Sequence, residues 1–491
     1  MFTPLDTVVL IVYMTGVIGL GTWMGRSQRS ARDYFLAGRN VPWWAVMLSV
    51  VATETSALTF ISIPATAYTA DFWILQLAFG YLIGRVGVAY VLLPGYFRGE
   101  LTTAYALLED RFGLGTRRFA SSIFMVTRAF ADSVRIFAAA IPLALITGWS
   151  YWQVILLVGA ATLVYTWYGG LKAVVWVDVV QMGLYIVGGI AALWVLAGAV
   201  PGGWSAISAA AAEAGTFRVV HLEGGAAQAT WLFTGLVGGA FLSMASHGVD
   251  HLVVQRLLAA PGLDGARKAI IGSGVVVLVQ FTLFLLVGAG LRAFYDGRVF
   301  ETPDEVFPLF IIEGLPPGLS GLIVAGVLAA AMSTVSSSLN SLASATTHDL
   351  YAPAIGREDA DHDEGGLLAA GRMFTLLWAA ILIGGAIAFE LVQQGTPIVV
   401  IALQIASFTF GPLLGGFLLG TLFEGPDQPD AILGIAAAVV AMTALWAVQT
   451  FGVITPVVDT LWFALIGSTL TVAVGLGSAA FRQAHRQSRG R

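Results

Sequence analysis

The sequence of 491 residues is 57% hydrophobic and only 11% charged, whereas an ordinary soluble chain carries roughly 25% charged residues. This composition excludes a soluble globular protein and predicts a polytopic membrane protein, while the net charge of -5 says little about partners. Cysteine is absent, which excludes disulfides and thiolate metal sites.

Apolar stretches of about 18 or more residues recur along the chain, and each is long enough to cross a hydrocarbon core of roughly 30 Å as a helix. We count thirteen of them, so the predicted fold is an all-α polytopic membrane protein. The first stretch, residues 5–24, has no basic residue before it and four arginines after it. This pattern predicts a retained helix rather than a cleaved signal peptide.

Lysine and arginine predict the orientation, because they are retained on the cytoplasmic side of short loops. If the N-terminus is outside, eighteen of the 24 basic residues fall in inside loops or in the tail. We therefore expect a multi-pass protein of the plasma membrane, or of the inner membrane in a Gram-negative bacterium, with the C-terminus in the cytoplasm. Three arginines fall within spans: Arg85, Arg128 and Arg135.

The second apolar segment, residues 43–68, carries a carboxylate within SVVATETSALTF (49–60). A charge at the centre of a spanning helix costs at least about 2.5 to 3.5 kcal/mol and normally faces a cavity or a partner. Glu54 stands among hydroxyl residues here, and the segment is predicted to be interrupted near the middle of the membrane.

A later span, TRAFADSVRIFAAA (127–140), carries two arginines and one aspartate. Arg128 and Asp132 are four residues apart and are expected to pair on one helical face. Because Arg128 and Asp132 satisfy each other, Arg135 is the arginine expected to face the cavity. Its planar guanidinium suits a carboxylate. Its expected partner is either a carboxylate of a bound solute or Glu54.

A second polar segment, residues 231–254, carries Ser243, His247 and Asp250 and is also predicted to be broken. Two broken segments in corresponding positions predict an inverted-repeat transporter, because unwound backbone frees carbonyls that coordinate ions. We assign residues 1–27 to an extra N-terminal helix and residues 40–200 and 228–422 to two inverted repeats of five helices each. Residues 428–491 are assigned to two C-terminal helices and a basic tail.

Hydroxyl side chains gather in AAAMSTVSSSLNS, residues 329–341. Ser333, Ser336, Ser337 and Asn340 are three to four residues apart and share one helical face. Small hydroxyl residues are also ordinary packing residues between membrane helices. Several neutral oxygens with one or two carboxylates nonetheless suit a monovalent cation, and Asp178 offers a buried carboxylate from another helix.

Five stretches together resemble the sodium:solute symporter family over residues 33–422. They are DYFLAGRNVPWWA (33–45), ATETSALTF (52–60), YGGLKAVVWVDVVQ (168–181), VVQRLLAA (253–260) and AAMSTVSSSLNS (330–341). The resemblance implies a core of two inverted five-helix repeats with one extra helix before it. It also implies that substrate and sodium bind near the midplane and that transport follows alternating access.

The resemblance also implies sodium ligands, carried over position by position. The family's main sodium site falls on the backbone carbonyls or hydroxyls of Ala52, Thr55, Ala330, Ser333 and Thr334. A second sodium site of some members falls on Asp178, Ser333, Ser336 and Ser337. One or two sodium ions are therefore expected as coupling ions, with no other cofactor.

Glu54 corresponds to an acidic residue that proline-transporting relatives tie to sodium use, where sugar transporters place an amide. It could add negative potential to the sodium sites, meet a donor of the substrate, or pair with a buried arginine. The sugar-transporter pattern fails at Ser246, His247 and Val277, which argues against a hexose. His247 is expected first to cap broken backbone, and alternatively to contact substrate or to sense pH. The candidate substrate-binding residues are Glu54, Ser56, Thr59, Gln76, Arg135, Ser243, His247 and Gln404.

We therefore predict a sodium-coupled symporter that imports a small polar organic solute. Arg135 favours a carboxylate-bearing solute, such as a sialic-acid-like compound, a monocarboxylate or an amino acid, and a neutral sugar or polyol is the alternative. A passive channel is a remote alternative, as is an intramembrane enzyme that uses Glu54, His247, Asp250 and His251. The expected partners are the solute, sodium and the lipid bilayer, with no nucleic acid, and the protein is expected to function as a monomer.

Overall fold

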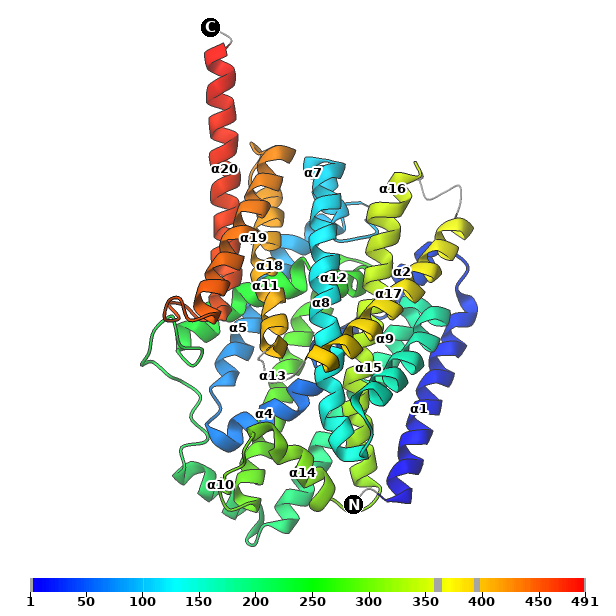
Figure 1. Ribbon diagram of the computed structural model, residues 1–491, viewed down its shortest axis with the longest axis vertical. Coiled ribbons are helices and arrows are strands. Elements are labelled where there is room, and N and C mark those ends of the chain that lie inside the picture. The colour runs from blue at the N-terminus through cyan, green and yellow to red at the C-terminus, as the bar shows by residue number, and fades with distance from the viewer. Residues whose placement is uncertain (1–2, 100, 357–363, 393–397, 490–491) are drawn as a thin grey trace.

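The computed structural model describes residues 3–99, 101–356, 364–392 and 398–489. These residues form helices and connecting segments without a strand, as expected where an apolar span must satisfy its own backbone groups. Most long helices run along one axis (Figure 1). Their bounds are α1 Pro4–Met24, α2 Ala31–Leu36, α3 Trp43–Glu54, α4 Ala57–Thr69, α5 Ile74–Gly87, α6 Leu93–Tyr96, α7 Ala106–Phe112, α8 Leu114–Thr147, α9 Tyr151–Ala199, α10 Gly203–Glu213, α11 Gly239–Gly248, α12 His251–Leu258, α13 Leu263–Phe294, α14 Val306–Glu313, α15 Leu319–Ala345, α16 Ala352–Ala354, α17 Glu364–Val392, α18 Ile398–Leu422, α19 Gln428–Thr450 and α20 Phe463–Arg489.

The all-α membrane fold is confirmed, but the helices do not correspond one to one with the thirteen predicted spans. Among the described residues, eight helices are long and apolar enough to cross a membrane, or nine if the bent pair 31–39 and 43–54 forms one span. The broken segments divide into pieces of 8 to 13 residues. Two predicted spans merge in α9, which has 49 residues and bends at Gly170, where φ is 52°. Thirteen spans and the repeat boundaries therefore stay predictions.

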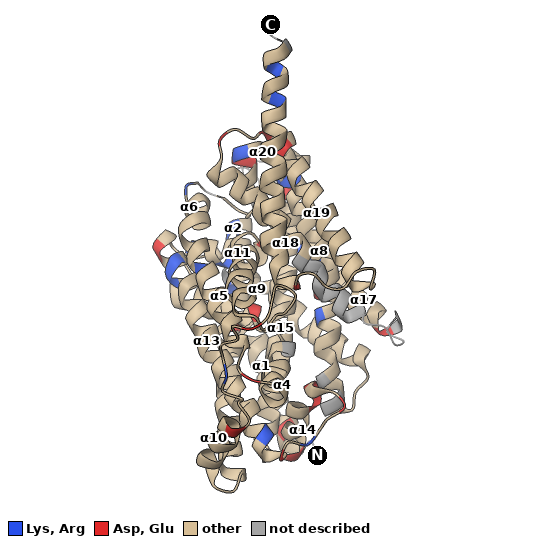
Figure 2. Cartoon of the chain, turned by 90° about the vertical axis from the view of Figure 1, so that its left-hand side faces the viewer, with Lys and Arg blue, Asp and Glu red and all other residues tan. Residues whose placement is uncertain are grey.

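The two ends of the chain lie at opposite ends of the molecule. The N-terminus lies beside the lower end of α1, and the C-terminus lies above the long α20 (Figure 1). Most of the side seen in Figure 2 is uncharged, and Lys, Arg, Asp and Glu gather mainly toward its upper and lower parts. This arrangement agrees with an odd number of membrane crossings.

Both predicted breaks are present. The first lies at residues 55–56, between α3 and α4. The second lies at residues 249–250, between α11 and α12. The loop after residue 201 contains one short helix, α10, and the turn at residues 316–318 leads into α15.

The serine-rich helix α15 lies at the centre of the fold. Every residue from Ile323 to Ala345 is buried, and α15 packs against α1, α8, α9 and α17. In α1, by contrast, most residues are at least partly exposed. One carboxylate joins the two helices: Asp6 accepts hydrogen bonds from the N–H groups of Gly318 at 2.7 Å and Gly321 at 2.8 Å. Asp6 therefore caps the start of α15 from another helix.

Candidate functional site

The first break frees backbone groups beside the predicted sodium ligands. α3 ends at Glu54, and Thr55 has an extended backbone with φ -77° and ψ 104°. Ser56 caps the start of α4, where its hydroxyl accepts a hydrogen bond from the Thr59 N–H at 3.3 Å. The last carbonyls of α3 therefore lack the amide donors that a continuing helix would supply. Unwound carbonyls of this kind coordinate sodium in broken-helix transporters.

A small cavity lies at this break. Its volume is about 10 Å³, and it is lined by Ala52, Thr55, Ala330 and Ser333 together with three residues of α9. That volume corresponds to about one water-sized sphere. The structure thus brings four of the five positions predicted for the main sodium site around one space. The fifth, Thr334, follows on α15, and its hydroxyl donates to the Ala330 carbonyl at 3.2 Å.

The residues predicted for a second sodium site meet around Asp178, but an arginine lies among them. Asp178 accepts hydrogen bonds from Ser333 at 2.7 Å and from Ser49 at 2.5 Å. The Arg256 guanidinium lies 3.3 Å from the same carboxylate. Arg256 stands in the VVQRLLAA motif, yet helical spacing alone gave no signal that it would face Asp178.

The other two predicted ligands of that site, Ser336 and Ser337, are engaged with neighbouring groups. Their hydroxyls donate to the Ser333 carbonyl at 3.1 and 2.6 Å. Ser337 also accepts a hydrogen bond from Arg256. A hydroxyl that accepts from a guanidinium has one lone pair fewer for an ion. The predicted set is therefore assembled, with Arg256 balancing the charge of Asp178.

Glu54 pairs with Arg85 of α5 and not with Arg135, the arginine that the sequence analysis expected. His247 Nε2 lies 3.0 Å from Arg85 and 3.4 Å from Glu54. Arg85 is fully buried and also donates to Ser273 of α13 at 2.8 Å. The interpretation of Glu54 as the partner of a buried arginine is confirmed, with Arg85 in place of Arg135.

His247 contacts polar groups through both ring nitrogens. Its Nδ1 lies 2.8 Å from the Ser246 hydroxyl and 3.2 Å from the Ser243 carbonyl. The Ser243 hydroxyl in turn donates to the Tyr81 carbonyl of α5 at 2.9 Å. This environment agrees with a supporting role for His247 near the second break, and contact of His247 or Ser243 with substrate stays a prediction.

The second break is held by side chains. Asp250 has an extended backbone and accepts a hydrogen bond from the Leu252 N–H at 3.0 Å, which caps α12. The same carboxylate pairs with Arg128 of α8. On the other side of the break, the Tyr96 hydroxyl donates to the Gly248 carbonyl at 2.7 Å. Two backbone groups at this break, the Gly248 carbonyl and the Leu252 N–H, therefore have side-chain partners.

Arg135 differs from the other arginines of this region in its exposure. Its side chain is 30% exposed, against 5% for Arg128 and none for Arg85. Its hydrogen bond to Asp132 is long, at 3.4 Å, because Asp132 also accepts from Arg128 at 3.1 Å and from Ser338 at 2.6 Å. The predicted Arg128–Asp132 pair is thus confirmed. Arg135 keeps guanidinium donors that no described residue uses.

Gln76 is not brought to the other predicted substrate-binding residues. Its amide donates to the Thr230 carbonyl at 2.9 Å and accepts from the His221 N–H at 3.1 Å. Nine residues separate it from Arg85, which corresponds to about 13 Å along α5. The structure therefore places Gln76 as a partner of the segment before α11, because its side chain turns toward that backbone.

Three predicted substrate-binding residues remain. The Ser56 and Thr59 hydroxyls lie 3.3 Å apart, where the break meets the first turn of α4. They form a pair of partly buried hydroxyls next to Glu54. Gln404 belongs to α18, but its side chain lies outside the described residues.

Comparison with known proteins gives a consistent set of likenesses. The model of the sodium:solute symporter family matches residues 34–437. The sodium/sialic acid symporter NanT of Aliivibrio fischeri is 29% identical over 96% of this chain and 92% of its own length. The sodium-coupled monocarboxylate transporter 1 of Xenopus laevis is 29% identical over 88% of this chain and 70% of its own length. A solved structure of a substrate-bound, outward-open Na+-coupled sialic acid symporter superposes with a TM-score of 0.87 at 26% identity, over 98% of both chains.

Proposed function

Because this chain belongs to the sodium:solute symporter family, we propose that it couples inward sodium movement to the import of a small carboxylate-bearing solute. Its family and relatives are sodium-coupled transporters, and it is a transporter and not an enzyme. The single observation that carries the solute class is Arg135, whose partly exposed guanidinium is held only by one long hydrogen bond among the described residues. A guanidinium with free donors binds a carboxylate in two-point geometry.

Charge balance supports an anionic solute. Among the described residues around the two breaks and Asp178, ion pairs join four arginines to four carboxylates: Arg85, Arg128, Arg135 and Arg256 with Glu54, Asp132, Asp178 and Asp250. One sodium ion adds one positive charge to this balanced set, and one solute carboxylate cancels it. An uncompensated charge in an apolar region is costly, so sodium and the solute each favour binding of the other.

We assign the main sodium site to Ala52, Thr55, Ala330, Ser333 and Thr334. An ion there would join the end of α3 to α15, two of the three elements that border the cavity. Binding would therefore favour one arrangement of the broken helix, and the solute would bind that arrangement better than the alternative. A second ion at Asp178 would have to share its oxygens with Arg256.

The neighbourhood of Arg135 and the first break favours an acid over a zwitterion. Because Glu54 is already paired with Arg85, its carboxylate would bind an ammonium group of the solute less strongly. The hydroxyls of Ser56 and Thr59 suit a hydroxylated acid. The relatives that carry sialic acid and monocarboxylates support the same solute class. We propose import with the N-terminus outside and the C-terminus in the cytoplasm, through a functional monomer.

The first test is the melting temperature of the detergent-purified protein against a panel of solutes, in sodium chloride and in choline chloride. Ligands that bind the folded state raise the melting temperature by mass action. We expect sodium alone to stabilise the protein and carboxylates to add to that effect only when sodium is present. The absence of any sodium effect would contradict the proposal, and stabilisation by neutral sugars alone would favour the alternative solute class.

Arg135→Lys tests the assignment of the carboxylate. Lysine keeps the positive charge but loses the planar pair of donors, so we expect the apparent Kd for a carboxylate to rise at least about tenfold. Binding of sodium without solute should stay unchanged in the same variant. If neutral solutes lose affinity to the same extent, Arg135 is a structural residue and the carboxylate assignment is wrong.

A further inference from the structure

We propose that Gln181 and Tyr185 of α9 complete the main sodium site as oxygen ligands on the side that faces away from the break. This inference rests on the sodium site proposed above, and it adds ligands that the sequence analysis did not assign. It would make the site a structure of three elements, α3, α9 and α15, instead of two.

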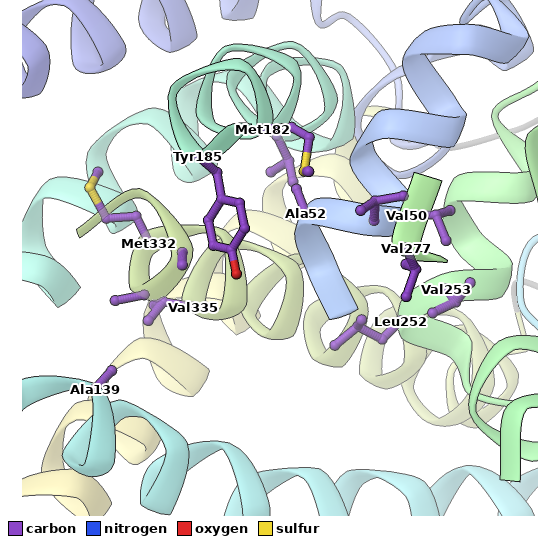
Figure 3. Close-up of a cluster of buried hydrophobic side chains, with 14 of the residues drawn as sticks. Val50, Ala52, Ala139, Met182, Tyr185, Leu252, Val253, Val277, Met332 and Val335 are labelled. Atoms are coloured by element: carbon purple, nitrogen blue, oxygen red, sulfur yellow. The ribbon is translucent and has the colours of Figure 1, made fainter. Parts of the chain in front are cut away.

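The first observation is where these two side chains lie. Gln181 and Tyr185 line the same cavity of about 10 Å³ as Ala52 and Ser333. They are four residues apart and so share one face of α9. Figure 3 shows Tyr185 extending from α9 with its hydroxyl toward the helix of Met332 and Val335, close to Ala52.

The second observation is that both oxygens lack partners. Gln181 Oε1 and the Tyr185 hydroxyl are buried, and neither forms a hydrogen bond with any described residue. The Gln280 amide lies near the Tyr185 hydroxyl without forming a hydrogen bond to it. Buried polar groups are almost always satisfied, so two unpartnered oxygens on one small cavity indicate a ligand between them.

The orientation of the Gln181 amide follows from α1. Its Nε2 donates to the Tyr13 hydroxyl at 3.1 Å. That hydroxyl directs its own hydrogen toward the Met332 sulfur at 4.0 Å, which leaves its oxygen to accept from Gln181. The amide nitrogen is therefore turned to α1, and the amide oxygen stays free. Tyr13 acts as a positioning residue for the ion site.

Amide and phenol oxygens are hard, neutral ligands, the type that monovalent cations accept in proteins. They add coordination without adding charge, so the charge balance of one sodium against one solute carboxylate is kept. A cavity of this size with polar walls also suits a single buried water. If the two oxygens bind sodium, removing either one lowers the affinity of the protein for sodium. If they bind only a water, the affinity for sodium stays unchanged.

The experiment titrates sodium into the full-length detergent-purified protein without solute and follows the melting temperature. Gln181→Met removes the amide oxygen at similar length, and we expect the sodium concentration for half-maximal stabilisation to rise about tenfold. Tyr185→Phe should raise it about threefold. Met182→Leu is the matched control, because Met182 lines the same cavity without offering an oxygen, and it should change nothing.

Two further variants sharpen the test, and the first of them keeps the inference testable if Gln181→Met fails to fold. Gln181→Glu keeps an oxygen at the site and should bind sodium at least as tightly as the original chain. Tyr13→Phe should raise the half-maximal sodium concentration about threefold when Gln181 is present and leave it unchanged in the Gln181→Met background, since Tyr13 acts through Gln181. Equal effects in both backgrounds would make Tyr13 merely structural.

The outcomes separate this inference from the proposed function. If Gln181→Met and Tyr185→Phe leave sodium affinity unchanged while Thr334→Ala weakens it, the cavity wall of α9 holds only water and the inference is overturned. In that case the proposed function stands. If sodium does not stabilise even the unaltered protein, the proposed function itself fails.

Discussion

The two breaks of the core differ in whether side chains form hydrogen bonds with the backbone groups that the breaks expose. At the second break, the Tyr96 hydroxyl donates a hydrogen bond to the Gly248 carbonyl. Asp250 caps α12 and also pairs with Arg128. At the first break, Ala52 and Thr55 border a cavity. A broken membrane helix is therefore not an ion site by itself. We propose that it becomes one where no side chain donates a hydrogen bond to the freed carbonyls.

The largest effect is expected from Asp250→Asn at the second break. Asparagine still caps a helix, but it leaves Arg128 with one carboxylate fewer in a buried place. We expect the free energy of unfolding to fall by about 3 kcal/mol, measured by denaturant titration in mixed micelles. Sodium affinity of the folded fraction should stay unchanged. A variant as stable as the original would show that the second break does not depend on its ion pair.

Substitutions at the first break are expected to weaken sodium affinity, whereas Asp250→Asn at the second break is expected to lower stability. Ser333→Ala or Thr334→Ala should raise the sodium concentration for half-maximal transport about tenfold in proteoliposomes and affect the maximal rate much less. Ser341→Ala is a control on the same helix, because its hydroxyl donates to the Ser338 carbonyl and does not line the cavity. Unchanged sodium dependence in both variants would remove the assignment of the main sodium site.

The smallest effect is expected from removing a single hydroxyl at the second break. Tyr96→Phe removes the hydrogen bond to the Gly248 carbonyl and should lower the free energy of unfolding by about 1 kcal/mol. Tyr105→Phe is a matched control, since Tyr105 is equally buried and its hydroxyl bonds to no described residue. Equal stability of the two variants would mean that the Gly248 carbonyl does not depend on Tyr96.

Features within one helix could be predicted from the sequence. The Arg128–Asp132 pair follows from a spacing of four residues, and both breaks follow from polar residues inside apolar segments. The all-α membrane fold follows from composition. Each of these depends on local geometry, which a helix repeats every 3.6 residues.

Contacts between helices could not be predicted in the same way. Glu54 pairs with Arg85 from another helix, and Arg256 reaches Asp178 across 78 residues of chain. Spacing tells which face of a helix a residue occupies, but it does not tell which helix meets that face. Gln181 illustrates the limit: it ends a recognised motif, yet its place at the cavity depends on how α9 is rotated against α3 and α15.

The Asp6 cap has a consequence for how the protein is made. Asp6 and its partner Gly318 are 312 residues apart, and chains grow at about 5 to 20 residues per second, so α1 waits roughly 15 to 60 seconds for α15 to be synthesised. Within its own segment, the Asp6 carboxylate accepts hydrogen bonds from Thr3 alone among the described residues. The contact between Asp6 and α15 can therefore form only late in synthesis, when the helix that carries the proposed sodium-binding hydroxyls has been made.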